Sequence, residues 1–326
     1  MFIRALASIS PQPTFGADQL PAESAGYSSN RLACIEPDYK EWIDPKMMRR
    51  MSRIIRMGVA TAALCLKNAG IETPDAIVTG SAYGCLEDTG LFLNRMIEFN
   101  EEMLNPTSFI QSTHNTVGAQ IALSVKCYGY NNTFVHRGFS FENALLDGIL
   151  LLKDNEVNNV LVGSADEITN ISFAVLNRFG RFSGGAAAGE GAAFFLLTNE
   201  PDPQNCAVLD AIHTFYKPAG ADAVVNEINR FLTSQSLSIS DIDLIINGMN
   251  GDPANDETYH ELNRGLFNSQ KNISYRNLCG EYPTSSSFAL WYAATMLKSE
   301  PKPPSRILIY NHYKNIHHSL FLVSSC

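Results

Sequence analysis

Hydrophobic positions along the chain follow two spacings, one typical of helices and one typical of buried strands. The first long helical pattern covers residues 46–68, where apolar residues recur every three or four positions and Gly70 follows as a C-cap. Short apolar runs at 75–79, 159–163 and 192–197 are typical of strands buried on both faces. Their alternation with helices predicts a largely parallel sheet with right-handed crossovers.

The same alternation of strands and helices continues to the end of the chain. Residues 1–200 and 201–326 form two similar halves, so we expect one integrated domain with an internally duplicated, layered α/β fold. The other expected helices are one that follows the turn at 80–88 and runs to about residue 103, then 116–125, 141–153, 221–234, 257–267 and 284–297. The other expected strands are a short opening strand, 133–135, 207–213, 244–247, 306–310 and 319–323.

Composition excludes several classes of function. The chain has 326 residues, of which 45% are hydrophobic and 17% charged, as in ordinary globular proteins. A net charge of −9 argues against a nucleic-acid partner. The one dense basic cluster is Lys46, Arg49, Arg50, Arg53 and Arg56. It is either a solvated helix face or a local attraction for an acidic carrier protein.

Cysteine use and the N-terminal segment bear on the cellular compartment. The seven cysteines are odd in number and form no CxxC pair, which favours reduced thiols over a disulfide framework. The start of the chain becomes polar too soon for a secretory signal, and no run of about 18 apolar residues exists to span a membrane. We therefore expect a cytoplasmic protein.

Residues 130–146 have the layout of a nucleophile elbow, in which a strand leads through a tight turn into a helix. The position of the nucleophile is Gly138. Glycine has no side-chain nucleophile, donor or base, so the turn has the shape of a reactive site without the reactive atom.

Four segments of the chain resemble the β-ketoacyl synthases of the thiolase superfamily. They are a first glycine turn (79–89), a segment leading to the dimer interface (105–122), a strand end (162–167) and a glycine-rich turn (181–192). The resemblance implies a thiolase-like αβαβα fold. Residues 49–53 are further similar to the divergent synthases and chain-length factors of aryl polyene and flexirubin-type pigment pathways.

The resemblance also implies a catalytic cysteine at a helix N-terminus, two histidines and a supporting lysine. This sequence carries none of them. Gly138 stands at the cysteine position, Gly248 and Glu281 stand at the histidine positions, and Arg276 replaces the lysine. We therefore expect no family condensation chemistry at this site.

Other residues offer substitute chemistry. Ser140 with His136 as its base, or the thiol of Cys279, could act as a nucleophile, whereas the alternatives are a helix cap for Ser140 and a buried structural thiol for Cys279. Glu281 is either a base or the ion-pair partner of Arg276.

The sequence predicts no cofactor and no metal. His317 and His318 are adjacent and would point to opposite faces of a strand, and no carboxylate or thiol completes a ligand set with His312. The glycine-rich run 184–191 lacks the Lys-Ser/Thr of a phosphate-binding loop.

These observations favour a non-catalytic ketosynthase homologue, in fatty acid or aryl polyene-type polyketide biosynthesis, that pairs with an active ketosynthase as a chain-length factor does. The resemblance implies an acyl carrier protein as a further partner and an interface around residues 105–140. Two alternatives stay open: an active acyltransferase or thioester hydrolase using Ser140 or Cys279, and a homodimeric acyl-binding scaffold. The expected tunnel and interface side chains are His114, Phe134, His136, Phe139 and Phe141.

Overall fold

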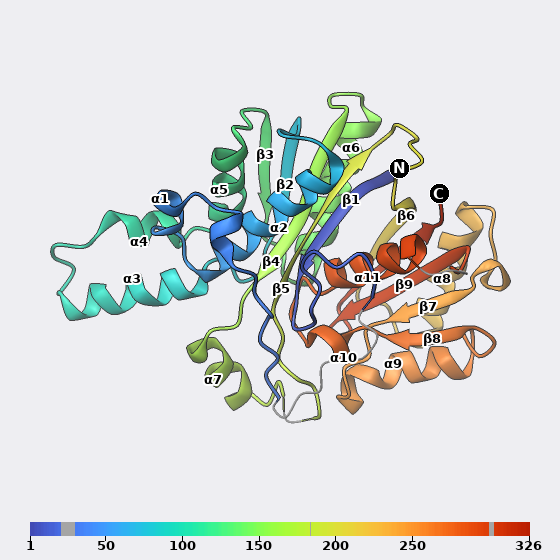
Figure 1. Ribbon diagram of the computed structural model, residues 1–326. Coiled ribbons are helices and arrows are strands. Elements are labelled where there is room, and N and C mark those ends of the chain that lie inside the picture. Colours follow the sequence, from blue (N-terminus) through green and yellow to red (C-terminus); the bar gives the residue numbers. More distant parts are fainter. Residues whose placement is uncertain (21–29, 183, 300–302) are drawn as a thin grey trace.

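The computed structural model describes residues 1–20, 30–182, 184–299 and 303–326. Its described strands form one ten-stranded mixed sheet (Figure 1). The strands are β1 (Phe2–Ile9), β2 (Ala76–Gly80), β3 (Tyr130–Phe134), β4 (Asn159–Asp166), β5 (Gly191–Thr198), β6 (Ala207–Tyr216), β7 (Leu244–Asn247), β8 (Lys271–Ser274), β9 (Arg306–Tyr313) and β10 (His317–Ser324).

Helices cover both faces of this sheet. The α-helices are α1 (Pro45–Met48), α2 (Arg53–Ala69), α3 (Leu86–Glu98), α4 (Pro106–Gln111), α5 (Thr116–Val125), α6 (Ser140–Lys153), α7 (Asn170–Arg178), α8 (Ala221–Ser234), α9 (Pro253–Arg264), α10 (Arg276–Cys279) and α11 (Ser286–Ser299), and the 3-10 turns are η1 (Tyr39–Glu41), η2 (Arg137–Phe139) and η3 (Ile239–Asp241).

The strand order shows an internal repeat. It runs β3-β2-β4-β5-β1 through the first half and then β6-β10-β9-β7-β8 through the second, so each half has the same arrangement in mirror order along the sheet. The two halves meet where β1 and β6 pair over only two residues, Phe2 and Ile3.

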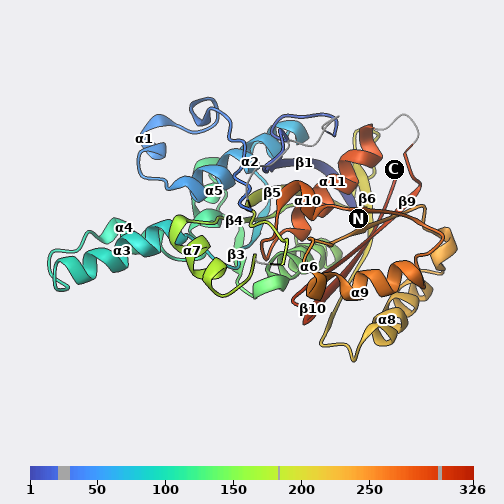
Figure 2. The same ribbon diagram turned by 90° about the horizontal axis from the view of Figure 1, so that it is seen from below.

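Three hydrophobic cores create the layers. A central core holds α6 and α11 between the inner faces of the two half-sheets. A second core packs α2 and α5 on the outer face of the first half-sheet, and a third packs α8 and α9 on the outer face of the second. Figures 1 and 2 show this succession of helix, sheet, helix, sheet and helix. Both faces of strands such as β2, β4 and β5 are therefore buried, which explains their continuous apolar runs.

The prediction of a largely parallel sheet was wrong. Parallel pairing is limited to β2 with β3 and β4, and to β7 with β8 and β9, while β5, β1, β6 and β10 pair antiparallel. The reason is that each half ends in a strand that returns beside its neighbour without a crossover helix, as the β9–β10 hairpin does.

Several predicted bounds also needed correction. The helix expected over 46–68 is two helices, because α1 ends at Met48 and α2 begins at Arg53 after Ser52 at its N-cap. The helix expected to reach residue 103 ends at Glu98, and β3 covers Tyr130–Phe134 instead of 133–135. The sequence interpretation missed α4, α7, α10 and β8, which are short or carry no clear apolar period.

Helices α3 and α4 form an arm that projects from the body of the protein (Figure 1). Several of its large apolar side chains are exposed to solvent: Leu91, Leu93, Ile97, Phe99, Met103, Phe109 and Ile110. Such a patch on a single chain marks an interaction surface.

Among the described residues, none of the helices combines the length and apolar character needed to cross a bilayer.

Candidate functional site

The predicted elbow lies between β3 and α6, and the space beside its central glycine is filled. A Cβ atom added at Gly138 would lie 2.3 Å from Cβ and 2.6 Å from Cγ of Tyr313. Tyr313 is the last residue of β9, in the other half of the chain. A cysteine at position 138 would therefore collide with the Tyr313 side chain, so position 138 has neither a nucleophile nor the room for one.

Gly248, which follows β7, is enclosed in the same way. A Cβ atom there would lie 2.6 Å from the Tyr259 hydroxyl oxygen, 2.9 Å from Asn311 Oδ1 and 3.4 Å from Arg276 Cζ. An imidazole at this position would occupy space that these polar groups already fill.

Arg276 and Glu281 form the charged centre of this cluster. Arg276 Nη1 lies 2.6 Å from Glu281 Oε2 and forms an ion pair with it. The N–H group does not point at the oxygen well enough to count as a hydrogen bond. Arg276 Nη2 donates to Asn311 Oδ1 at 2.8 Å and to the His312 carbonyl at 2.9 Å. Asn250 adds a hydrogen bond to Glu281 Oε2 at 3.0 Å. The prediction that Glu281 pairs with Arg276 is confirmed.

Burial and charge act on Arg276 in opposite directions. Burial alone would lower the pKa of its guanidinium, but the negative charge of Glu281 and the neighbouring phenols of Tyr275 and Tyr259 more than offset it, and the pKa stays above its ordinary value. The Arg276 guanidinium is therefore charged, and Glu281 is its ion-pair partner.

Ser140 is buried, and its hydroxyl bonds to backbone groups. It donates to the Arg137 carbonyl at 2.8 Å and accepts from the His136 N–H at 2.9 Å. The N-cap of α6 is Phe139, so Ser140 instead joins the turn to the first residue of the helix. The His136 ring bonds to Asn143 through Nδ1 at 2.8 Å, so the expected Ser140–His136 pair is not formed between their side chains.

Cys279 is fully buried at the end of α10. Burial raises the pKa of its thiol well above the ordinary value, which disfavours the thiolate that a nucleophile needs. Its hydrogen bond goes to the Gly280 carbonyl at 3.4 Å. These features are those of a structural thiol. All seven cysteines are free thiols.

The five expected tunnel and interface residues do not share one surface. Phe141 is buried in the central core beside Phe195 and Phe321, so it is a core residue and not a wall of a tunnel. Phe139 packs edge-on against His317, with the two ring centroids 4.5 Å apart. The others lie nearer solvent: Phe134 is half-buried, His136 is exposed, and His114 is exposed on the loop before α5.

An apolar groove lies elsewhere among the described residues, between α3 and α7. It has a volume of about 540 Å³ and is lined by Tyr83, Leu86, Thr89, Gly90, Leu91, Leu93, Ile171, Val175 and neighbouring side chains. The sequence interpretation missed it because α7 was not predicted. The available signal was the helical spacing of Ile171 and Val175.

The basic cluster divides into a structural part and an exposed part. Arg53 is held by Glu190, with Nη2 2.5 Å from Oε1, and its Nε contacts Glu36. Lys46 and Arg50 instead line an open groove of about 510 Å³ with Ile110 and Leu123. Arg49 is exposed beside them.

The described residues hold no group of three or more His, Cys, Asp or Glu side chains placed to bind a metal. The glycine-rich run 184–191 packs closely on its surroundings, and Ser183 beside it lies outside the described residues. His317 and His318 do face opposite ways, toward Phe139 and toward Tyr310 respectively.

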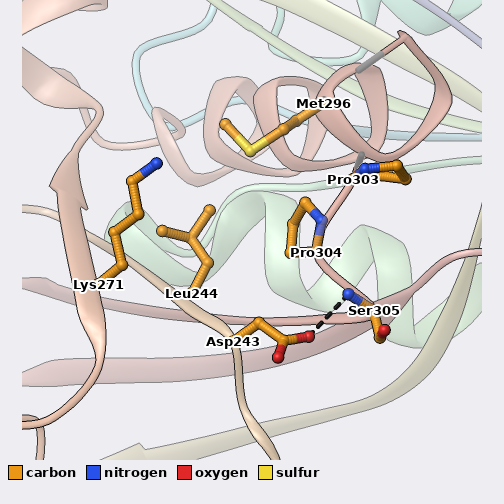
Figure 3. Close-up of a pocket in the computed structure, with 7 residues that line it drawn as sticks. All are labelled: Asp243, Leu244, Lys271, Met296, Pro303, Pro304 and Ser305. Atoms are coloured by element: carbon orange, nitrogen blue, oxygen red, sulfur yellow. Dashed lines mark hydrogen bonds between the residues drawn. The ribbon is translucent and has the colours of Figure 1, made fainter. Parts of the chain in front are cut away.

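Another hollow, of about 320 Å³, lies at the beginning of β7 (Figure 3). Gly248 follows the other end of that strand. Its carboxylate, Asp243, accepts hydrogen bonds from the backbone N–H of Ser305 at 2.7 Å and of Arg306 at 3.0 Å. Asp243 therefore joins two strand ends, and the hollow is separate from the elbow.

A family model described as beta-ketoacyl synthase, N-terminal domain, matches residues 28–193. A search of curated protein sequences returned no match.

Solved structures with the same fold cover the whole chain. One is the ishigamide ketosynthase/chain length factor, with a TM-score of 0.80, 15% identity, and coverage of 100% of this chain and 98% of that chain. A beta-ketoacyl synthase from Burkholderia phymatum matches with a TM-score of 0.77, 14% identity, and coverage of 100% and 99%. A ketosynthase in complex with its chain length factor from Xenorhabdus doucetiae matches with a TM-score of 0.75, 13% identity, and coverage of 100% and 98%.

Proposed function

Because the chain belongs to the beta-ketoacyl synthase family, we propose that it is a non-condensing subunit that pairs with an active ketosynthase, as a chain-length factor does. Its pathway would be fatty acid or polyketide biosynthesis of the aryl polyene type. The similarity to solved ketosynthase and chain length factor structures supports the scaffold that this role requires.

The observation that carries the proposal is the filling of both reactive positions. Tyr313 occupies the space beside Gly138, and the Arg276 cluster occupies the space beside Gly248. Nucleophilic attack on a thioester needs an accessible thiolate or an activated hydroxyl. Cys279 and Ser140 supply neither, because the first is buried and the second bonds to the backbone.

The surface around residues 105–140 supports an interface with the synthase. Strand β3 is the edge of the sheet, and an unpaired edge is a ready template for another strand. Exposed apolar side chains lie on it and beside it, among them Tyr130, Tyr128 and Leu123, and the arm formed by α3 and α4 adds more. An edge strand beside an apolar patch is the arrangement that a partner subunit would cover.

The groove between α3 and α7 is our candidate for the site that holds the acyl chain. Its apolar lining suits a hydrocarbon chain, and its size limits how much chain fits. Acidic carrier proteins would dock at the exposed cations Lys46, Arg49 and Arg50, since local positive charge on an acidic chain attracts an acidic partner.

Mixing the purified chain with each ketosynthase of its own pathway tests the proposal. We expect a stable heterodimer by native mass spectrometry and size-exclusion chromatography. The double variant Leu123→Asp/Tyr128→Asp should weaken association at least about tenfold, because it places charge in the apolar patch. Tyr216→Asp, at an exposed ring outside residues 105–140, is the control and should associate as the wild type does.

Two results would overturn the proposal. A chain that stays monomeric with every synthase of its pathway lacks the required partner. A chain that forms only a homodimer fits the acyl-binding scaffold instead. Incubation with acyl and malonyl thioesters followed by intact mass analysis tests the remaining alternative, because an adduct that disappears in Ser140→Ala would identify an active enzyme.

A further inference from the structure

Two Asn-Gly pairs lie close together at the end of β7 and in the loop that follows it: Asn247-Gly248 and Asn250-Gly251. An asparagine before a glycine is open to an intramolecular reaction, in which the glycine backbone nitrogen attacks the side-chain amide carbon. Glycine permits this attack because it has no Cβ atom to shield its nitrogen. The two pairs have different surroundings in the folded protein, and the differences bear on whether each can react.

The side chain of Asn250 is fixed by two hydrogen bonds. Its Oδ1 accepts from the backbone N–H of Asp252 at 3.0 Å, which is the geometry of an Asx turn. Its Nδ2 donates to Glu281 Oε2 at 3.0 Å. The N–H of Asp252 therefore polarises the amide carbonyl and would stabilise the oxyanion that forms when a nucleophile attacks it. Gly251 has a φ of +89°, a conformation that favours glycine at this turn.

Asp256, in the first turn of α9, provides a base for the attack. Its Oδ2 accepts from the backbone N–H of Gly251 at 2.9 Å, which is within the reach of a general base. Its Oδ1 accepts from the backbone N–H of Asn250 at 3.0 Å and from Asn255 Nδ2 at 2.9 Å, so the carboxylate is held in place. Gly251 is exposed and Asn250 is half-buried, so water reaches the loop.

Asn247 provides a comparison within the same segment. Its Oδ1 also accepts from the backbone N–H two residues on, that of Met249, at 3.2 Å. Asn247 is only 2% exposed, however, and its backbone is paired in the sheet between β8 and β9. Among the described residues, no carboxylate bonds to the N–H of Gly248. The first pair therefore has the turn but lacks the base and the access to water.

We propose that Asn250 is a self-modification site, at which the folded protein converts this asparagine to aspartate or isoaspartate. A bond forms between the Gly251 nitrogen and Cγ of Asn250, and the bond from Cγ to Nδ2 breaks, which gives a cyclic imide. The proton that Asp256 takes from the Gly251 nitrogen leaves with Nδ2 as ammonia. Water then opens the imide at either of its carbonyl groups. The reaction needs no oxidant, reductant or protein partner, so it is independent of the proposed pairing with a synthase.

The product changes the charged cluster at Arg276. A carboxylate at position 250 replaces the amide N–H that donates to Glu281, whose carboxyl group is already ion-paired with Arg276. Two carboxyl groups at this distance repel one another when both are ionised. We therefore expect the modified protein to be less stable than the unmodified one.

Incubation of the purified full chain in heavy-oxygen water at pH 7.5 tests the reaction, because water that opens the imide labels the product. Both asparagines lie in the tryptic peptide 231–264, so tandem mass spectrometry follows the two in one molecule. In the folded protein we expect Asn250 to convert at least about a hundredfold faster than Asn247, as general-base catalysis implies. In urea, where the base is no longer held in place, Asn250 should slow down and the two rates should become similar. Equal rates in the folded protein, or a faster conversion of Asn250 in urea, would overturn the inference.

The consequence for stability has its own test. Asn250→Asp reproduces one product and should have a lower midpoint of urea denaturation than the wild type. Asn268→Asp adds the same charge at an exposed loop position and should keep the wild-type midpoint. An Asn250→Asp variant with the wild-type midpoint would show that the modification leaves the charged cluster intact.

Discussion

The first half of the chain turns from β3 through η2 into α6, and the second half makes the corresponding turn from β8 through α10 into α11. In the first turn, Gly138 presents bare backbone against Tyr313. In the second, Arg276 is a buried cation paired with Glu281. The Tyr313 side chain fills the space at the first turn, and a buried ion pair fills the space at the second.

The comparison teaches that the proposed loss of reactivity would involve more than Gly138, Gly248 and Glu281 themselves. The second half supplies the ring that fills the first turn, and its own turn supplies the guanidinium beside Gly248. Restoring a single catalytic residue would therefore meet an occupied space. Tyr313 at the first turn, and Tyr259, Asn311 and Arg276 at the second, already fill the space that such a residue would need.

The largest effect should come from breaking the charged turn. Arg276→Met leaves Glu281 buried beside Asn250 without its main counter-ion, and we expect a loss of about 3–5 kcal/mol in the free energy of unfolding. Urea denaturation at pH 7.5 measures it. The double variant Arg276→Met/Glu281→Gln should recover at least half of the loss, since no charge is left unpaired. A loss below about 1 kcal/mol in the single variant would show that the pair does not hold the turn.

The next effect concerns Glu142, which joins the two halves behind the elbow. Its Oε1 accepts from Ser319 Oγ at 2.9 Å, and its Oε2 has no hydrogen-bond partner among the described residues. Burial raises the pKa of this carboxyl to about 7. The folded protein then holds a proton that the unfolded chain releases above its ordinary pKa of 4.5, so stability from this group falls as the pH rises from 4.5 through 7.

Glu142→Gln should remove that dependence. Thermal melts from pH 5 to pH 8 should show the variant gaining on the wild type as the pH rises, by up to about 3 kcal/mol. Asp241→Asn, at an exposed carboxyl, is the control and should produce no such gain at high pH. Parallel pH profiles of Glu142→Gln and wild type would contradict the prediction.

A smaller effect should follow from overfilling the first turn. Gly138→Cys places a side chain against Tyr313, and we expect a loss of about 1–3 kcal/mol. Adding Tyr313→Ala should relieve part of it. Gly90→Cys, where the nearest atom to a new Cβ is 3.9 Å away, should cost little. If Gly138→Cys is as stable as wild type, the ring does not close the turn.

The smallest effect concerns thiol reactivity. Cys326 is exposed and Cys279 is buried, so iodoacetamide should modify the first and spare the second in the folded protein. Cys326→Ser should change the free energy of unfolding by less than about 0.5 kcal/mol. Peptide mapping after alkylation measures both sites. Rapid alkylation of Cys279 in the folded protein would make it a candidate nucleophile again.

Several elements with a clear apolar pattern were predictable from the sequence. The helices at 116–125 and 221–234 and the strand at 244–247 have the predicted bounds. Strand direction was not predictable, because a buried strand shows the same apolar run whether its neighbours are parallel or antiparallel. Helix α7, and with it the apolar groove, was missed because a short helix with few buried residues shows little contrast in the sequence.

The sequence by itself determined that positions 138 and 248 carry no reactive side chain, since glycine has none in any fold. Only the tertiary structure decided which residues fill the space beside these two glycines. Tyr313 lies 175 positions after Gly138 in the sequence. It reaches the turn only because the two half-sheets pack around shared central helices. Contacts between residues so distant along the chain depend on the packing of whole layers, which no local pattern records.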